Sequence, residues 1–296
     1  MRVAYLGPAG TFSEDALEVS RFAPEGFEPL PTETIPAAIE AVASGNADRA
    51  LVPVENSIEG SVRPTLDSLI ELADSVRIVG EFDHEIRQAL IGRAGLEFGA
   101  IEVVLSHPQP LAQCALFLRT ELPGAEVQVA TSTSAAVREV GASPKAWAAL
   151  GPARAARIYD CEVLREGIED EPGNVTRFLW LAARPDGEAH HSGEVSPVPT
   201  DLLVGDQGGN WKTSLAFAEL GADHPGALVE ALHAFSDRNV NLVRIESRPM
   251  RRELGRYRFF IDIEGREDSD EVAAAINGLK SKAEWVRVLG SYPANS

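Results

Sequence analysis

The sequence predicts an α/β protein built in two parts, and three patterns support this prediction. Over residues 1–184, short apolar runs alternate with amphipathic stretches of about ten residues, the rhythm of βαβ units that form parallel sheets. Residues 185–209 lose this periodicity and are rich in Pro, Gly, Ser and His, as linkers are. Residues 210–296 resume the alternation over a shorter span. We therefore expect two folded parts that separate at a linker.

The first part opens with a strand, a loop and a helix. Residues 2–6 form a short apolar run, and Thr11-Phe12-Ser13-Glu14 has the spacing of a capping box at a helix start. Apolar periodicity gives the remaining elements. The expected strands cover residues 2–6, 49–54, 76–82, 87–92, 101–106, 127–130 and 176–182, and the expected helices cover residues 11–21, 34–44, 62–73, 108–121 and 132–140.

The second part has the order β-α-β-β-α-β, which is that of a ferredoxin-like unit. Such a unit exposes a sheet edge and one sheet face, so we expect it to pair with a second copy. The expected strands cover residues 212–220, 240–246, 257–264 and 285–289, and the expected helices cover residues 225–238 and 269–279.

Composition and charge limit the possible functions. The 296 residues are 44% hydrophobic and 24% charged, which is typical of a globular protein. The net charge of −18 opposes binding to nucleic acid or to anionic membranes, and a small anionic substrate would need a locally basic pocket. No stretch approaches the 18 apolar residues of a membrane span and no signal peptide is apparent, so we expect a cytoplasmic protein.

The cysteines and histidines do not indicate a metal site. Cys114 and Cys161 lie far apart, without CxxC spacing or a neighbouring His cluster, which is typical of core thiols. His190 and His191 stand in the linker without acidic or thiol partners, so we interpret them as solvated side chains.

Polar segments stand where predicted strands give way to helices. These are residues 7–13, 53–62, 106–109 and 131–134, and residues 174–178 open the last strand of the first part. In open α/β sheets ligands bind beyond the carboxyl ends of the strands, which favours a binding site there. Helix capping is the other interpretation of each segment.

Two residue types in these segments leave alternatives open. Ser106 and His107 could act as nucleophile and base, or they could cap a helix. Arg177 could clamp a carboxylate with two parallel hydrogen bonds, or it could be a surface arginine.

Together these segments resemble the prephenate dehydratase family along essentially the whole chain, and the tail resembles an ACT regulatory domain. The matching segments of the first part, in the family's order, are residues 7–13, 53–62, 106–109, 112–114, 131–136 and 174–178. The last of these carries the family's Thr-Arg-Phe signature. In the tail, residues 225–228 resemble the start of the first ACT helix, and residues 246–249 resemble the segment that follows the second ACT strand.

The resemblance implies a fold and an activity. Residues 1–184 would form a catalytic domain of two α/β lobes like those of periplasmic binding proteins, with residues 84–175 as the second lobe, and residues 210–296 would form the ACT domain. The implied reaction converts prephenate to phenylpyruvate, carbon dioxide and water in phenylalanine biosynthesis, without a cofactor. An arogenate dehydratase and a non-catalytic metabolite sensor remain alternatives.

The resemblance also implies site residues and partners. Catalysis is expected of Thr176, Arg177 and Glu55. Substrate binding is expected of Thr11, Asn56, Ser57, Ser106, Gln109, Ser132, Thr133 and Phe178. Phenylalanine is the expected allosteric ligand, at the interface of paired ACT domains in a homodimer or homotetramer. Its expected contacts are Gly226, Ala227, Leu228, Asn241, Leu242, Glu246, Ser247 and Arg248.

Overall fold

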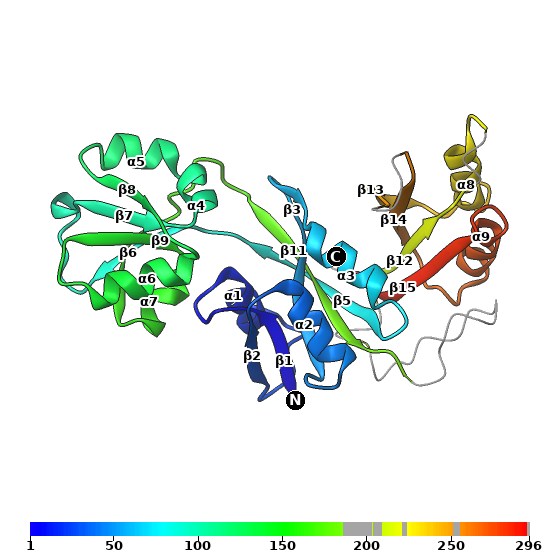
Figure 1. The fold of residues 1–296 in the computed structure, drawn as a ribbon, viewed down its shortest axis with the longest axis horizontal. Helices are drawn as coiled ribbons and strands as arrows, with labels where there is room; N and C mark the ends of the chain where they lie inside the picture. Colours follow the sequence, from blue (N-terminus) through cyan, green and yellow to red (C-terminus); the bar gives the residue numbers. More distant parts are fainter. Residues whose placement is uncertain (186–202, 204–208, 221–223, 251–254, 295–296) are drawn as a thin grey trace.

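The structure is a computed structural model, and it describes residues 1–185, 203, 209–220, 224–250 and 255–294. Two α/β lobes and a C-terminal unit follow one another along the long axis of the molecule (Figure 1). The predicted α/β class, the two lobes and the ferredoxin-like order are confirmed. The predicted linker, residues 185–209, lies almost entirely outside the described residues, as do His190 and His191.

The first lobe comprises residues 1–85 and 175–185, and its sheet has the strand order β2-β1-β3-β11-β5. β1 is parallel to β2 and β3, whereas β11 is antiparallel to both β3 and β5. The sheet is therefore mixed rather than parallel, because β11 brings the chain back from the second lobe. The strands are β1 (Arg2–Leu6), β2 (Glu28–Thr32), β3 (Arg49–Asn56), β5 (Val76–Glu85) and β11 (Val175–Ala183), and the short β4 (Gly60–Ser61) pairs with β3.

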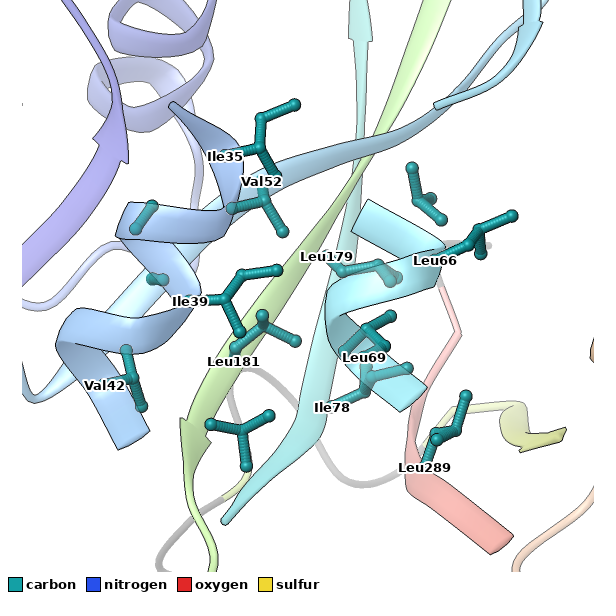
Figure 2. Close-up of a cluster of buried hydrophobic side chains, with 14 of the residues drawn as sticks. Ile35, Ile39, Val42, Val52, Leu66, Leu69, Ile78, Leu179, Leu181 and Leu289 are labelled. Carbon is teal, nitrogen blue, oxygen red and sulfur yellow. The ribbon is translucent and has the colours of Figure 1, made fainter. Parts of the chain in front are cut away.

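Helices cover both faces of this sheet. α1 (Phe12–Val19) packs on one face through Ala16 and Leu17. α2 (Ile35–Ala43) and α3 (Arg63–Glu71) pack on the other, where Ile39 and Leu69 meet the apolar residues of β3, β5 and β11 (Figure 2). β2 was not predicted from the sequence, because its two prolines interrupt the apolar pattern. They are tolerated because β2 is an edge strand.

The second lobe, residues 86–174, has the strand order β10-β6-β9-β7-β8, again mixed. Its strands are β6 (Ala89–Arg93), β7 (Val103–Ser106), β8 (Glu126–Val129), β9 (Trp147–Gly151) and β10 (Cys161–Glu166). α6 (Thr133–Ala142) and α7 (Ala153–Ile158) cover one face, α4 (Pro108–Gln113) and α5 (Ala115–Glu121) the other, and η1 (Phe98–Ala100) precedes β7. β9 and α7 were not predicted from the sequence, and of β10 only the start at Cys161 was expected.

The single helix predicted over residues 108–121 is wrong, because the chain breaks at Cys114 into α4 and α5. Asp170 explains the break, because its carboxylate accepts hydrogen bonds from the backbone N–H groups of Leu116 (2.8 Å) and Phe117 (3.1 Å). This carboxylate caps a second helix start inside the predicted helix.

The C-terminal unit is an antiparallel sheet with the order β13-β14-β12-β15. Its strands are β12 (Trp211–Ala218), β13 (Leu242–Pro249), β14 (Tyr257–Glu264) and β15 (Trp285–Pro293). α8 (Ala227–Ser236) and α9 (Asp270–Lys280) cover one face. The other face packs on the first lobe, where Phe260 and Leu289 join its apolar cluster. Figure 2 shows Leu289 beside this cluster. Gly290 lies so close that an added Cβ would stand 2.2 Å from the Ile78 carbonyl oxygen.

Among the described helices, none is long and apolar enough to cross a membrane.

Candidate active site

A cavity of about 1140 Å³ lies between the two lobes. The first lobe lines it with the loop after β1, with the end of β3 and with the beginning of β11, and the second lobe lines it with the beginnings of α4 and α6. The predicted polar segments, which follow strands and precede helices, lie at this edge of the two sheets. Of the expected site residues, the cavity is lined by Thr11, Asn56, Gln109, Ser132, Thr133, Thr176 and Phe178.

Thr176 and Asn56 form a hydrogen-bonded pair in this cavity. Asn56 Nδ2 donates hydrogen bonds to Thr176 Oγ1 (2.9 Å) and to Asn174 Oδ1 (2.6 Å), while its Oδ1 accepts from the N–H groups of Ile58 and Glu59 (3.0 Å each). The two backbone donors fix the orientation of the amide, so Asn56 must donate to Thr176. Within the described residues the Thr176 hydroxyl has no acceptor for its own proton.

A bulge in β3 aims Asn56 into the cavity. Phe178 is paired with Pro53 and Arg177 with Glu55, so Val54 is an extra residue on β3. A bulge reverses the alternation of side chains beyond it. Asn56 consequently shares a face with Thr176, and Glu55 shares the opposite face with Arg177.

Two helices of opposite lobes begin at the cavity. Thr11 caps α1 by accepting from Glu14 N (3.4 Å), and Ser132 caps α6 by accepting from Ala135 N (3.0 Å). Both caps line the cavity. The N-terminal end of a helix carries partial positive charge and free N–H groups, so this arrangement favours an anion.

Four expected residues lie outside the cavity lining. Ser57 is exposed, and its hydroxyl accepts from Val175 N (3.0 Å). Ser106 is completely buried and donates to the Leu150 carbonyl oxygen (2.8 Å), which removes it as a nucleophile. Glu55 and Arg177 lie on the far face of the sheet, toward the C-terminal unit.

Arg177 forms ion pairs with two carboxylates of the protein, so it is not free to bind a carboxylate of a ligand. Its Nε lies 2.8 Å from Glu81 Oε2 on β5, and its Nη1 lies 2.7 Å from Asp262 Oδ2 on β14. Burial alone would lower the pKa of the guanidinium, but the neighbouring Tyr292 and the two carboxylates raise it well above its usual value. These contacts leave no place for a substrate carboxylate.

Two cavity residues carry or can carry positive charge. Arg138 on α6, which was not predicted, is the one Arg or Lys among the described residues that line the cavity. His107, for which the sequence left a base or a helix cap open, also lines the cavity and caps α4 by accepting from Gln109 N (3.4 Å). Arg138 is exposed and has no ion pair with a described residue. Its position five residues after Thr133, a member of the 131–136 segment, is the one signal that could have indicated it.

One side of the cavity is closed by contacts between the lobes. The Tyr159 hydroxyl, after α7, donates to the Ala9 carbonyl oxygen (2.7 Å), and Arg154 Nη2 lies 3.0 Å from Glu18 Oε1 on α1. Gly10, at φ +81°, packs against the Tyr159 ring, which an added Cβ would approach to 3.0 Å. Gly10 therefore permits the close approach of the two lobes.

The expected effector residues lie at opposite ends of the C-terminal sheet. Ala218 at the end of β12 pairs with Arg258 of β14, and Arg258 pairs with Arg248 near the end of β13. Since α8 follows β12, the start of α8 and the end of β13 lie at the same end of the sheet. Gly226, Ala227, Leu228 and Ser247 belong to this end, while Asn241 and Leu242 are at the other. Glu246 accepts from the Ser61 hydroxyl (2.9 Å) and Arg248 pairs with Asp67 (2.9 Å), so both face the first lobe.

Comparison with known proteins agrees with the earlier resemblance. Residues 3–186 match the family model described as prephenate dehydratase, and residues 219–281 match the ACT domain. A prephenate dehydratase of Mycobacterium sp. (strain JLS) is 40% identical over 304 residues, covering 100% of this chain and 90% of the relative.

Two solved structures are similar over nearly the whole chain. The prephenate dehydratase of Arthrobacter aurescens in complex with L-Phe is 37% identical with a TM-score of 0.82, covering 99% of this chain and 90% of that one. GqqA, described as a quorum quenching acylase, is 28% identical with a TM-score of 0.84, covering 100% and 98%. The family match covers more than half of the chain, and the chain therefore belongs to the prephenate dehydratase family, with an ACT domain in its C-terminal part.

Proposed function

We propose that this chain converts prephenate to phenylpyruvate, carbon dioxide and water in the cavity between its lobes. The observation that carries the proposal is the Thr176 hydroxyl. It faces the cavity, accepts a hydrogen bond from Asn56 and keeps its own proton for a ligand. A hydroxyl held in this way suits a reaction in which a C–O bond breaks and the departing oxygen must be hydrogen-bonded.

Binding of a substrate with two carboxylates fits the charges of the cavity. The starts of α1 and α6 offer N–H groups from opposite lobes, and Arg138 supplies a full positive charge. An overall net charge of −18 makes this local concentration of positive potential necessary. The Thr11, Ser132 and Thr133 hydroxyls and Gln109 complete the proposed polar contacts.

The chemistry requires little besides orientation and hydrogen bonding. The bond between the ring and its carboxylate breaks, so that carbon dioxide leaves and the bonding electron pair enters the ring. The C–O bond of the ring hydroxyl then breaks, and the departing oxygen takes up one proton, supplied in the net reaction by solvent, and leaves as water. Formation of the aromatic ring drives the reaction. Thr176 donates to the leaving oxygen, and this hydrogen bond strengthens as negative charge develops on the oxygen in the transition state.

The direct test is incubation of the purified protein with prephenate, with phenylpyruvate followed by its absorbance in alkali. Arogenate, in which an amino group replaces the ketone, is assayed in parallel by release of phenylalanine. Faster turnover of prephenate supports the proposal. Faster turnover of arogenate identifies the alternative dehydratase, and binding of prephenate without turnover of either identifies a sensor.

We also propose that phenylalanine binds the ACT domain and that a second copy completes its site. Support comes from the Arthrobacter aurescens relative in complex with L-Phe. β13 is an edge strand, and Val243 and Ile245 on it are 43% and 44% exposed. Val229 of α8 is 56% exposed. Pairing of two such edges in a homodimer, or in a homotetramer of two pairs, would cover these side chains.

A further inference from the structure

Four side chains form a closed ring between the first lobe and the ACT domain. Arg177 donates from Nη1 to Asp262 (2.7 Å) and from Nη2 to the Tyr292 hydroxyl (3.0 Å). Ser214 donates to the second oxygen of Asp262, and its hydroxyl lies 2.7 Å from that of Tyr292. Since the Ser214 proton is committed to Asp262, Tyr292 donates to Ser214. Three of the four members stand on different ACT strands: β12, β14 and β15.

The ring is buried and stays charged. Burial alone would raise the pKa of Asp262, but Arg177 and Arg244 hold it below its usual value. Burial raises the pKa of Tyr292, so its hydroxyl keeps the proton that it donates. Outside the ring, Glu81 of β5 joins Arg177 Nε (2.8 Å) to Lys212 of β12 (2.8 Å).

The two strands that hold the active-site pair are both tied to the ACT domain at the neighbouring residue. On β11, Thr176 faces the cavity and Arg177 enters the ring. On β3, Asn56 faces the cavity and the adjacent Glu55 lies 3.0 Å from Arg244 of β13. A displacement of the ACT sheet would therefore move the backbone next to both Thr176 and Asn56.

We propose that Arg177, Asp262, Ser214 and Tyr292 are positioning residues through which the ACT sheet sets the Thr176–Asn56 hydrogen bond. The inference rests on the proposed function of Thr176. The ACT domain would then help to shape the catalytic site, in addition to its proposed role in binding phenylalanine. A misplacement of a catalytic group by about 1 Å can lower a rate by roughly 10²-fold, so small shifts in the ring are sufficient.

The test uses the full chain with the variants Tyr292→Phe and Ser214→Ala, which open the ring without leaving an unpaired charge. We expect kcat to fall about 10-fold in each, with KM changed less than about twofold, because substrate contacts are untouched. The matched control is Thr213→Val. It removes a fully buried hydroxyl of β12 that bonds to Ser291 and Gly265 on the opposite face of the sheet.

Coupling to Thr176 separates positioning from general stability. In a Thr176→Ala background, Tyr292→Phe should cause no further loss of kcat, since the group that it positions is gone. Two outcomes would overturn the inference. One is a kcat of the ring variants equal to that of Thr213→Val. The other is a full additional loss of kcat when Tyr292→Phe is added to Thr176→Ala. A Thr176→Ala enzyme with undiminished kcat would instead overturn the proposed role of Thr176.

Discussion

The direction in which Thr176 donates its proton is decided by Asn56. The amide of Asn56 cannot turn over, because Ile58 and Glu59 occupy its oxygen with backbone N–H groups. Thr176 is only 8% exposed, so water competes weakly for its hydroxyl. This geometry prepares a hydrogen-bond donor before the substrate arrives, which is the condition for strong transition-state stabilisation.

Replacing Thr176 by Ala should lower kcat by about 10²–10³-fold, the usual effect of removing one preorganised donor. Thr176→Ser keeps the hydroxyl and should retain most of the activity. Steady-state kinetics with prephenate measure both, and circular dichroism establishes that the variants are folded. Near-normal turnover by a folded Thr176→Ala chain would contradict the role.

Replacing Arg138 by Gln should raise KM for prephenate by about 10- to 100-fold, because one charge-assisted hydrogen bond to a carboxylate is lost. The effect on kcat should be small, since that carboxylate is bound alike in the ground state and the transition state. Arg157→Gln is the matched control, because Arg157 is an exposed arginine of α7 outside the cavity lining. Equal KM values for the two variants would exclude Arg138 from substrate binding.

Among the elements, α6 contributes its N-terminal end to the cavity and its apolar face to the core of the second lobe. Ser132→Ala should lower the free energy of unfolding by about 1 kcal/mol, the typical value of a helix N-cap. It should also raise KM about two- to fivefold, because the end of α6 frays where the anion binds and the proposed contact of the Ser132 hydroxyl with the substrate is lost. Denaturant unfolding and kinetics measure the two effects.

Thr34→Ala provides the comparison. Thr34 caps α2 in the same way, accepting from Ala37 N (3.2 Å), but its side chain does not line the cavity. The Thr34→Ala variant should show a similar decrease in the free energy of unfolding, and its KM should equal that of the unaltered chain. A KM increase common to both variants would point to stability rather than to anion binding.

The positions of some cavity side chains follow from the sequence, and the positions of others depend on tertiary structure. Thr176 and Phe178 are two residues apart on a strand, so their common face follows from alternation. The placement of Asn56 does not, because the bulge at Val54 exists only where β3 pairs with a strand about 120 residues away. Arg138 lies on the polar side of an amphipathic helix, and only the opposing lobe turns that side into a cavity wall.

Arg177 shows the same limit. In the sequence it is a charged residue in an apolar strand, which left a carboxylate clamp and a surface arginine as alternatives. Its partners Asp262 and Tyr292 lie 85 and 115 residues further on, in a different domain. The local pattern is the same for a clamp and for an interdomain contact, so the distinction comes from tertiary structure alone.

In the molecule as a whole, the ACT domain and the first lobe share one core, although the linker composition predicted parts that separate. Asp262→Asn should therefore lower the stability of the entire chain, by about 3–5 kcal/mol at neutral pH, as removal of one buried ion partner does. The pKa of Asp262 is lowered in the fold, so its contribution is complete above the unfolded value of about 4.

Unfolding in denaturant at a series of pH values measures this contribution. The stability difference between the unaltered chain and Asp262→Asn should be constant from pH 7 to about pH 5 and should shrink as the pH falls below about 4. A difference that shrinks already near pH 6 would contradict the assignment to this carboxylate.

Phenylalanine bound at the ACT domain should weaken substrate binding by a coupling free energy of about 1–3 kcal/mol, and the substrate should weaken phenylalanine binding equally. Calorimetric titration of phenylalanine, with and without a substrate analogue in the cavity, measures both directions. Phenylalanine binding that the analogue leaves unchanged, with activity also unaffected, would contradict regulation.

The position of β11 between β3 and β5 has a consequence for synthesis on the ribosome. β5 ends at Glu85 and β11 begins at Val175, and the whole second lobe is encoded between them. At roughly 5–20 residues per second, the unfinished first sheet waits about 5–20 s for the internal strand that joins β3 to β5. The second lobe is contiguous in the chain and can fold during that interval. The active site is therefore assembled late, when β11 inserts and brings Thr176 beside Asn56.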